Sequence, residues 1–184
     1  MKNLRRITLS LTAVAIVSMS FVSVVWAQQP TVGIKNFRSY LASLETVTGV
    51  KASKVPSIIK FYSDNVTGLP KNGVVTELNG PTLMKYAGLA GLFCQEYAKQ
   101  LESSNTAPIE LDATKPGGVV KNVSLEKRTA LINSYAGLFL DRAATPLEVQ
   151  NNLAFAQALG DSSNMKMAIG FCTSFGASIE FIAE

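Results

Sequence analysis

The sequence predicts an all-α protein with about six helices. After residue 33, apolar residues recur every three or four positions along most of the chain, which is the spacing of one helix face. Residues that commonly start helices (Ser, Thr and Pro) and glycines that end them bracket these segments. No long segment alternates apolar and polar residues at period two, so we expect no strands.

Two helices are expected in the first part of the domain. The first covers 34–49 and ends at Gly49. The second covers 53–70, with Ser53 as its cap and Pro56 in its first turn. Their apolar faces consist of Ile34, Phe37, Leu41, Leu44 and Val47, and of Ile58, Ile59, Phe61, Tyr62 and Val66.

A third helix follows a loop over 70–81. It begins at Pro81 and continues over 82–104. Gly88 and Gly91 lie within it, where each costs about 1 kcal/mol relative to alanine, so we expect them to allow close approach of a neighbouring helix. Its predicted core stripe is Leu83, Ala87, Ala90, Cys94, Tyr97 and Leu101.

Residues 104–123 show the weakest signal for regular structure. Pro108, Pro116 and the Gly117-Gly118 pair interrupt the segment. A stretch of this length is either a linker between two helical halves or a long loop with a function.

Two further helices start at clear capping signals. Ser124 caps a helix over 125–142, with Leu131, Tyr135 and Leu138 inside. The sequence TPLE then forms a capping box, in which Thr145 precedes a proline and Glu148 follows three positions later. The helix that it starts ends at Gly160.

The last helix is expected over 164–182, capped by Ser162 or Ser163. Its predicted stripe is Met165, Ile169, Cys172, Gly176 and Ile179. The six helices would form either a single bundle or two packed three-helix halves.

The N-terminal residues have the pattern of a secretory signal peptide. Three basic residues open the chain without an acid, and an apolar run over 7–25 ends in Val-Trp-Ala. We predict a signal peptide over 1–27, cleaved between Ala27 and Gln28, and a helical domain over 28–184 in the periplasm or secreted. An uncleaved membrane anchor is the alternative, because the apolar run approaches bilayer-spanning length. The arginine pair leaves both Sec and twin-arginine export open.

The charge balance excludes a nucleic-acid binder. Without the three basic residues of the predicted signal peptide, the 17 lysines and arginines fall to 14, against 13 acidic residues. A nearly neutral domain without a basic run lacks the positive surface that binds phosphates. We therefore expect no nucleic-acid partner, and a membrane contact only through an uncleaved signal segment.

The chain contains no histidine, which removes the most common general base and metal ligand. It also lacks the Cys-x-x-Cys, phosphate-loop and Gly-x-Ser-x-Gly motifs. We therefore expect no cofactor, metal or catalytic residue, although carboxylate chemistry stays possible.

The two cysteines, Cys94 and Cys172, both fall in the middle of predicted helices among apolar residues. An even count in an exported chain favours a disulfide between them. Two unpaired core thiols and a reactive thiol are the alternatives. A reactive thiol needs an activating cation, and Lys99 and Lys166 lie a turn or more away along the sequence.

Other candidate residues have ordinary structural interpretations. After Asp141, we expect Arg142 to bond the last carbonyls of its helix, with an anion contact as the alternative. Glu96 and Glu180 are expected on solvated helix faces, although paired carboxylates can also do acid–base chemistry or bind a cation. We expect Phe171, Phe175 and Phe181 to pack in the core. The alternative is that they line an apolar pocket.

Two stretches resemble uncharacterised helical modules of exported bacterial surface proteins. The pattern YLASLETVTGV…LP…LAGLFCQEYAKQ resembles a helical module of large exported proteobacterial proteins, in which a T-G-V turn, an L-P and a later cysteine recur in that order. The pattern LFLDRAATPLEVQNNLAFAQAL…CTSFGASIEFI is similar to helical repeats of secreted surface proteins that read R-x-P-T/D…S-x-E-F. It departs from them at Ala143-Ala144, which precede the Thr-Pro pair here, whereas those repeats place a proline sooner after the arginine. The resemblance implies an exported accessory or surface module and no particular reaction.

These observations predict an exported helical accessory or structural protein that binds a protein partner in the bacterial envelope or at its surface. One alternative is a helical-bundle carrier of a small apolar ligand, which requires an enclosed apolar cavity. Another is an enzyme without histidine that uses carboxylates or a cysteine, which requires polar groups with shifted pKa values in a cleft.

Overall fold

The computed structural model of this chain describes residues 33–67, 69, 79–112, 114–115 and 117–183. The predicted signal peptide, with its cleavage site between Ala27 and Gln28, lies outside the described residues, as does most of the loop expected over 70–81.

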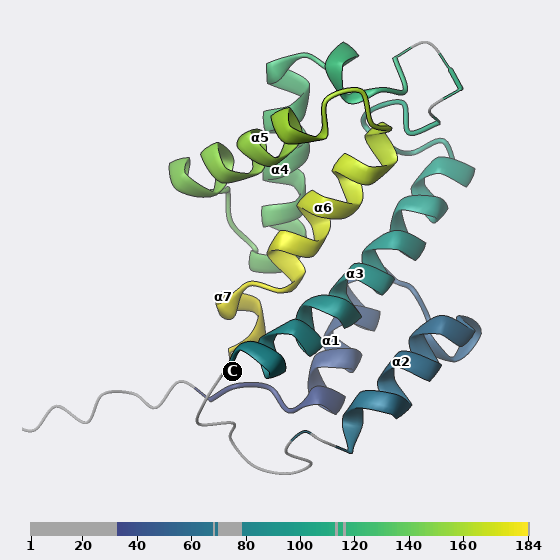
Figure 1. Ribbon diagram of the computed structural model, residues 1–184, viewed down its shortest axis with the longest axis vertical. Coiled ribbons are helices and arrows are strands. Elements are labelled where there is room, and N and C mark those ends of the chain that lie inside the picture. The colour runs from purple at the N-terminus through teal and green to yellow at the C-terminus, as the bar shows by residue number, and fades with distance from the viewer. Residues whose placement is uncertain (1–32, 68, 70–78, 113, 116, 184) are drawn as a thin grey trace, which may run out of the picture. The chain divides into compact units, whose positions relative to one another are not determined.

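The all-α prediction is confirmed for the described part of the chain (Figure 1). Its β-structure is limited to two isolated bridges. Two short 3₁₀ turns cover Ala52–Lys54 and Val120–Asn122. The α-helices described are α1 (Phe37–Thr48), α2 (Pro56–Val66), α3 (Gly80–Ser103), α4 (Leu125–Leu140), α5 (Pro146–Leu159), α6 (Asn164–Gly176) and α7 (Ile179–Ile182).

Side-chain caps explain where most of these helices begin. Each cap accepts a hydrogen bond from the backbone N–H three residues later, which satisfies one of the free donors of the first turn. Thr145 and Glu148 form the predicted capping box at the start of α5. The capping residues are Asn36, Asn79, Ser124, Thr145, Ser163 and Ser178.

Two predicted starts are wrong. The first helix begins at Phe37 because Asn36 caps it, and Ile34 instead pairs with Ala183 in an antiparallel bridge. Ser53 does not cap α2, since it lies in a 3₁₀ turn and α2 begins at Pro56 without a side-chain cap.

The single helix predicted over 164–182 is also wrong. It ends at Gly176, and the hydroxyl of Ser178 then accepts a hydrogen bond from Phe181 N to start the short helix α7. The change of direction exposes Ile179 and buries Phe181 and Ile182. The predicted core stripe treats 164–182 as one helix, and it therefore places Ile179 on the wrong face.

Helices α3 and α6 form the centre of the domain and pack side by side (Figure 1). α1 and α2 pack on α3, whereas α4 and α5 pack on α6. The buried apolar residues of both groups belong to one continuous core. The described helices therefore form two packed halves around a shared core, which is one of the two arrangements expected.

The irregular stretch after α3 is a packed loop. Ile109, Leu111 and Val120 are buried in the core. The side chain of Asn164, at the start of α6, donates hydrogen bonds to the carbonyls of Glu110 and Gly117 at 2.6 and 2.7 Å. These contacts hold the loop against the second half of the domain.

Close approach is confirmed at one of the two glycines of α3. A Cβ added to Gly88 would lie 2.6 Å from Cζ of Phe61 on α2, which is far too close. At Gly91 an added Cβ would lie 3.8 Å from the Thr173 hydroxyl, an ordinary contact. Close approach is therefore needed at Gly88 only.

We predict that two glycine-to-alanine substitutions differ in their effect on stability, with a gain at Gly137 and no gain at Gly88. Gly137→Ala in α4 meets nothing within 4 Å, so it should raise the free energy of unfolding by about 1 kcal/mol through helix propensity. Gly88→Ala gains the same propensity but displaces the Phe61 ring, and overpacking of this kind costs about 1–3 kcal/mol. Urea unfolding of both variants checks the prediction, and an equal gain in both would contradict it.

Candidate functional site

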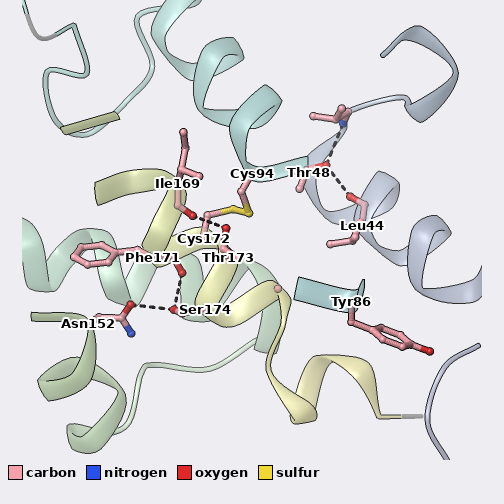
Figure 2. Close-up of a disulfide and its surroundings, with 12 residues drawn as sticks. Leu44, Thr48, Tyr86, Cys94, Asn152, Ile169, Phe171, Cys172, Thr173 and Ser174 are labelled. Atoms are coloured by element: carbon pink, nitrogen blue, oxygen red, sulfur yellow. Dashed lines mark hydrogen bonds between the residues drawn. A yellow bond between two sulfur atoms is a disulfide. The ribbon is translucent and has the colours of Figure 1, made fainter. Parts of the chain in front are cut away.

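The predicted disulfide is present between Cys94 of α3 and Cys172 of α6 (Figure 2). Both cysteines are buried, and their Cα atoms lie 5.7 Å apart. The bond joins residues 78 positions apart, and closing a loop of this length in the unfolded chain stabilises the fold by about 4–5 kcal/mol in the chain-entropy account. The pairing leaves no free thiol, so Cys172 has a structural role.

An open apolar groove runs beside this central pair of helices. It has a volume of about 500 Å³ and is bordered by α3, α5 and α6. We call it the Phe155 groove; its lining residues are Ala87, Asn151, Asn152, Phe155, Gly170, Thr173, Ser174 and Ala177.

Phe155 packs directly against α6 because Gly170 has no side chain. A Cβ at Gly170 would lie 2.2 Å from Cε1 of the Phe155 ring. The ring also packs edge-on against Phe171, with 6.3 Å between the ring centroids, and it remains 40% exposed. The groove therefore has a large, partly exposed aromatic wall.

Three of the four polar side chains that line the groove, those of Asn152, Thr173 and Ser174, are already bonded within the protein. The Ser174 hydroxyl lies 2.9 Å from Asn152 Oδ1 and 2.8 Å from the carbonyl oxygen of Phe171, so two acceptors share its proton (Figure 2). Asn152 Nδ2 donates to the Glu148 carbonyl, and the Thr173 hydroxyl donates to the Ile169 carbonyl. An apolar occupant would therefore leave none of these groups unpaired.

Arg142 does not act mainly as the carbonyl cap that the sequence predicted. Its guanidinium donates to both carboxylate oxygens of Glu148 at 2.9 Å, and it also binds Glu180 through two nitrogens. One carbonyl contact remains, to Ala143. Asp141, just before it, ends α4 in the left-handed conformation. Arg142 thus links the start of α5 to α7.

These hydrogen bonds shift the carboxyl pKa values. The guanidinium of Arg142 and, to a smaller extent, the capping bonds from Thr145 lower the pKa of Glu148 to about 2. The pKa of Glu180 is also lowered, chiefly by its hydrogen bonds from Arg142. The cluster holds the fold together and offers no carboxyl with a raised pKa for acid catalysis.

The other sequence candidates do not converge on one place. Glu96 forms a surface ion pair with Lys99 at 2.7 Å. Phe171, Phe175 and Phe181 are buried in the core, as expected. Within the described ranges no group of three or more potential ligand side chains is placed to hold a metal ion, and none of the helices there is long and apolar enough to cross a membrane.

The Phe155 groove is not predictable from the periodicity of α5 alone. Leu147, Asn151 and Phe155 lie four residues apart and so share one face of α5, while Asn152 and Ala156 are the residues that it buries. The available signal was that Leu147 and Phe155, two large apolar residues, lie on the exposed side of α5 rather than on the side that it buries. The presence of a groove there depends on Gly170, which lies on another helix.

No protein-family model, curated protein or solved structure matches the chain.

We predict that Glu148 makes the fold less stable in acid. Its pKa of about 2 in the folded protein lies below its ordinary value of 4.5, so the ionised carboxylate stabilises the fold above pH 4.5. This stabilisation is lost as the pH falls from 4.5 to 2. Glu148→Gln should therefore lower the urea midpoint at pH 7 and have a progressively smaller effect below pH 4.5.

Glu126→Gln is the matched control, because Glu126 also lies in a first helical turn but has no basic partner in the described residues. A loss of stability in Glu148→Gln that is the same at pH 3 and pH 7 would contradict the assignment.

Proposed function

We propose that this chain is an exported helical accessory protein that binds an apolar segment of an envelope or surface protein in the Phe155 groove. The observation that carries the proposal is the groove itself, with its exposed aromatic wall and the internal hydrogen bonds of Asn152, Thr173 and Ser174. A helix of a partner protein fits such a groove by inserting its apolar face.

Exposed apolar side chains next to the groove support a protein partner. Met84 is 76% exposed and lies one turn before Ala87 on the same face of α3. Leu147 is 64% exposed and lies on the groove face of α5, two turns before Phe155. These side chains extend the apolar surface beyond the groove, and surfaces of this kind mark interaction sites.

Export is supported by two independent features. The first 27 residues have the charge and hydropathy pattern of a signal peptide. The buried disulfide suits a protein that folds in an oxidising compartment such as the periplasm.

A carrier of a small apolar ligand is the second candidate. The groove volume of about 500 Å³ lies in the range of small-molecule sites. The groove is open to solvent, which favours an extended macromolecular partner over an enclosed ligand. An enzyme is the least supported candidate, because Glu148 and Glu180, whose pKa values are lowered, are both occupied by Arg142.

The export half of the proposal predicts a defined intact mass. Protein recovered from the periplasm should lack residues 1–27 and should take up no alkylating reagent until it is reduced. After reduction, two alkyl groups should be added, on Cys94 and Cys172. A full-length mass with both thiols reactive before reduction would overturn both the cleavage and the oxidising compartment.

The binding half predicts site-specific crosslinking in intact cells. A photo-crosslinking amino acid at Asn151, at the rim of the groove, should give one discrete adduct with another protein. The same amino acid at Gln157, which lies about 200° around α5 from Phe155, should not. Adducts of equal yield from both positions, or an adduct with a second copy of this chain, would overturn the proposal.

Two substitutions separate the groove from general surface effects. Phe155→Glu should abolish the adduct, and Gly170→Ala should weaken it by displacing the Phe155 ring. Leu125→Glu is the control, because it places the same charge on a 64% exposed apolar residue of α4. A bound small molecule in the native mass spectrum, without a protein adduct, would favour the carrier instead.

A further inference from the structure

Met84 is the most exposed large apolar side chain of the described domain. It is 76% exposed and lies in the first turns of α3. Three positions later comes Ala87, which lines the Phe155 groove, so both residues share one face of α3. A thioether is therefore open to solvent next to the proposed binding surface.

The other sulfur atoms of the predicted mature chain are shielded. Of the five methionines, Met1 and Met19 fall in the predicted signal peptide, which leaves Met84, Met165 and Met167. Met167 is 0% exposed, and Met165 is partly buried against the core. Both cysteines are buried and already joined in the disulfide. An oxidant that reacts with accessible sulfur therefore meets Met84 first.

Oxidation by a peroxide would change the chemistry of this side chain. The sulfur lone pair forms an S–O bond as the O–O bond of the peroxide breaks, and the second oxygen leaves as water. Sulfur loses two electrons and the peroxide gains them. The product, methionine sulfoxide, is polar, so it no longer contributes to an apolar surface. Because Met84 lies outside the buried core, the oxidised side chain stays in water and the helices stay packed.

We propose that Met84 is a reversible oxidation site and that its oxidation by peroxide weakens partner binding at the Phe155 groove. The inference rests on the proposed function of the groove. A partner that covers Met84 gains from burying the thioether but must remove water from the sulfoxide, which is costly. Binding and oxidation therefore oppose each other in both directions, so a bound partner protects the sulfur from peroxide. Methionine sulfoxide reductases restore the thioether.

The oxidation site is tested on the purified mature protein without any partner. Hydrogen peroxide should add about 16 Da, one oxygen atom, and peptide mapping should place it on Met84. Met165 and Met167 should react more than about tenfold more slowly, because their sulfur atoms are reached fully only when the domain opens. In concentrated urea all three should react at similar rates. Similar rates in the folded protein would overturn the site.

The effect on binding is tested by photo-crosslinking from Asn151 in intact cells, before and after brief peroxide treatment. The chain with Met84 should lose about tenfold in adduct yield after treatment. Met84→Leu should keep its adduct, because leucine is apolar and has no sulfur. Met165→Leu is the matched control and should lose its adduct as the unchanged chain does. Met84→Gln, which places a polar side chain of similar length there, should give a low yield without peroxide.

An equal loss of adduct in Met84→Leu and in the unchanged chain would overturn the regulation, because peroxide would then act on another group. A full yield from Met84→Gln would overturn it as well. If the untreated chain gives no adduct, the proposed function of the groove fails and the regulation fails with it. The reaction of the purified protein with peroxide decides the oxidation site separately.

Discussion

The contact between α3 and α6 determines where the other helices of the described domain can lie. The Cys94–Cys172 disulfide fixes it covalently. One turn away, Gly176 also allows close packing, since a Cβ there would lie 3.3 Å from Cβ of Ala90. The pair joins the two halves of the chain. Separating α3 from α6 would therefore open the core that the two halves share. The same contact places the α3 and α6 walls of the Phe155 groove next to each other.

Buried tyrosine hydroxyls orient the N-terminal half on this pair. Tyr40 donates a 2.6 Å hydrogen bond to the carbonyl of Gly176, and Tyr86 donates one of the same length to the carbonyl of Lys35. Burial raises the pKa of both hydroxyls, so they stay protonated and remain donors. Because an unpaired buried hydroxyl is costly, these bonds favour one orientation of α1 over others that would bury the same apolar area.

The Phe155 groove lies where the sequence departs from choices that favour stability. A partly exposed phenylalanine forms one of its walls. The fold does not depend on burying this ring, because a continuous buried core and the disulfide hold the helices together. A covalently closed core of this kind tolerates such local costs, and proteins commonly accept them at functional sites.

The sequence by itself determined the all-α class, the capped starts of α4, α5 and α6, and the pairing of the two cysteines. These depend on helical periodicity, on caps that act within three residues, and on there being only two cysteines to pair. Only the tertiary structure decided the break before α7, the partners of Arg142 and the Phe155 groove. Arg142 binds Glu180, 38 residues away, and Phe155 lies on Gly170 of another helix. Local signals cannot specify such contacts, because the packing of the whole chain brings these residues together.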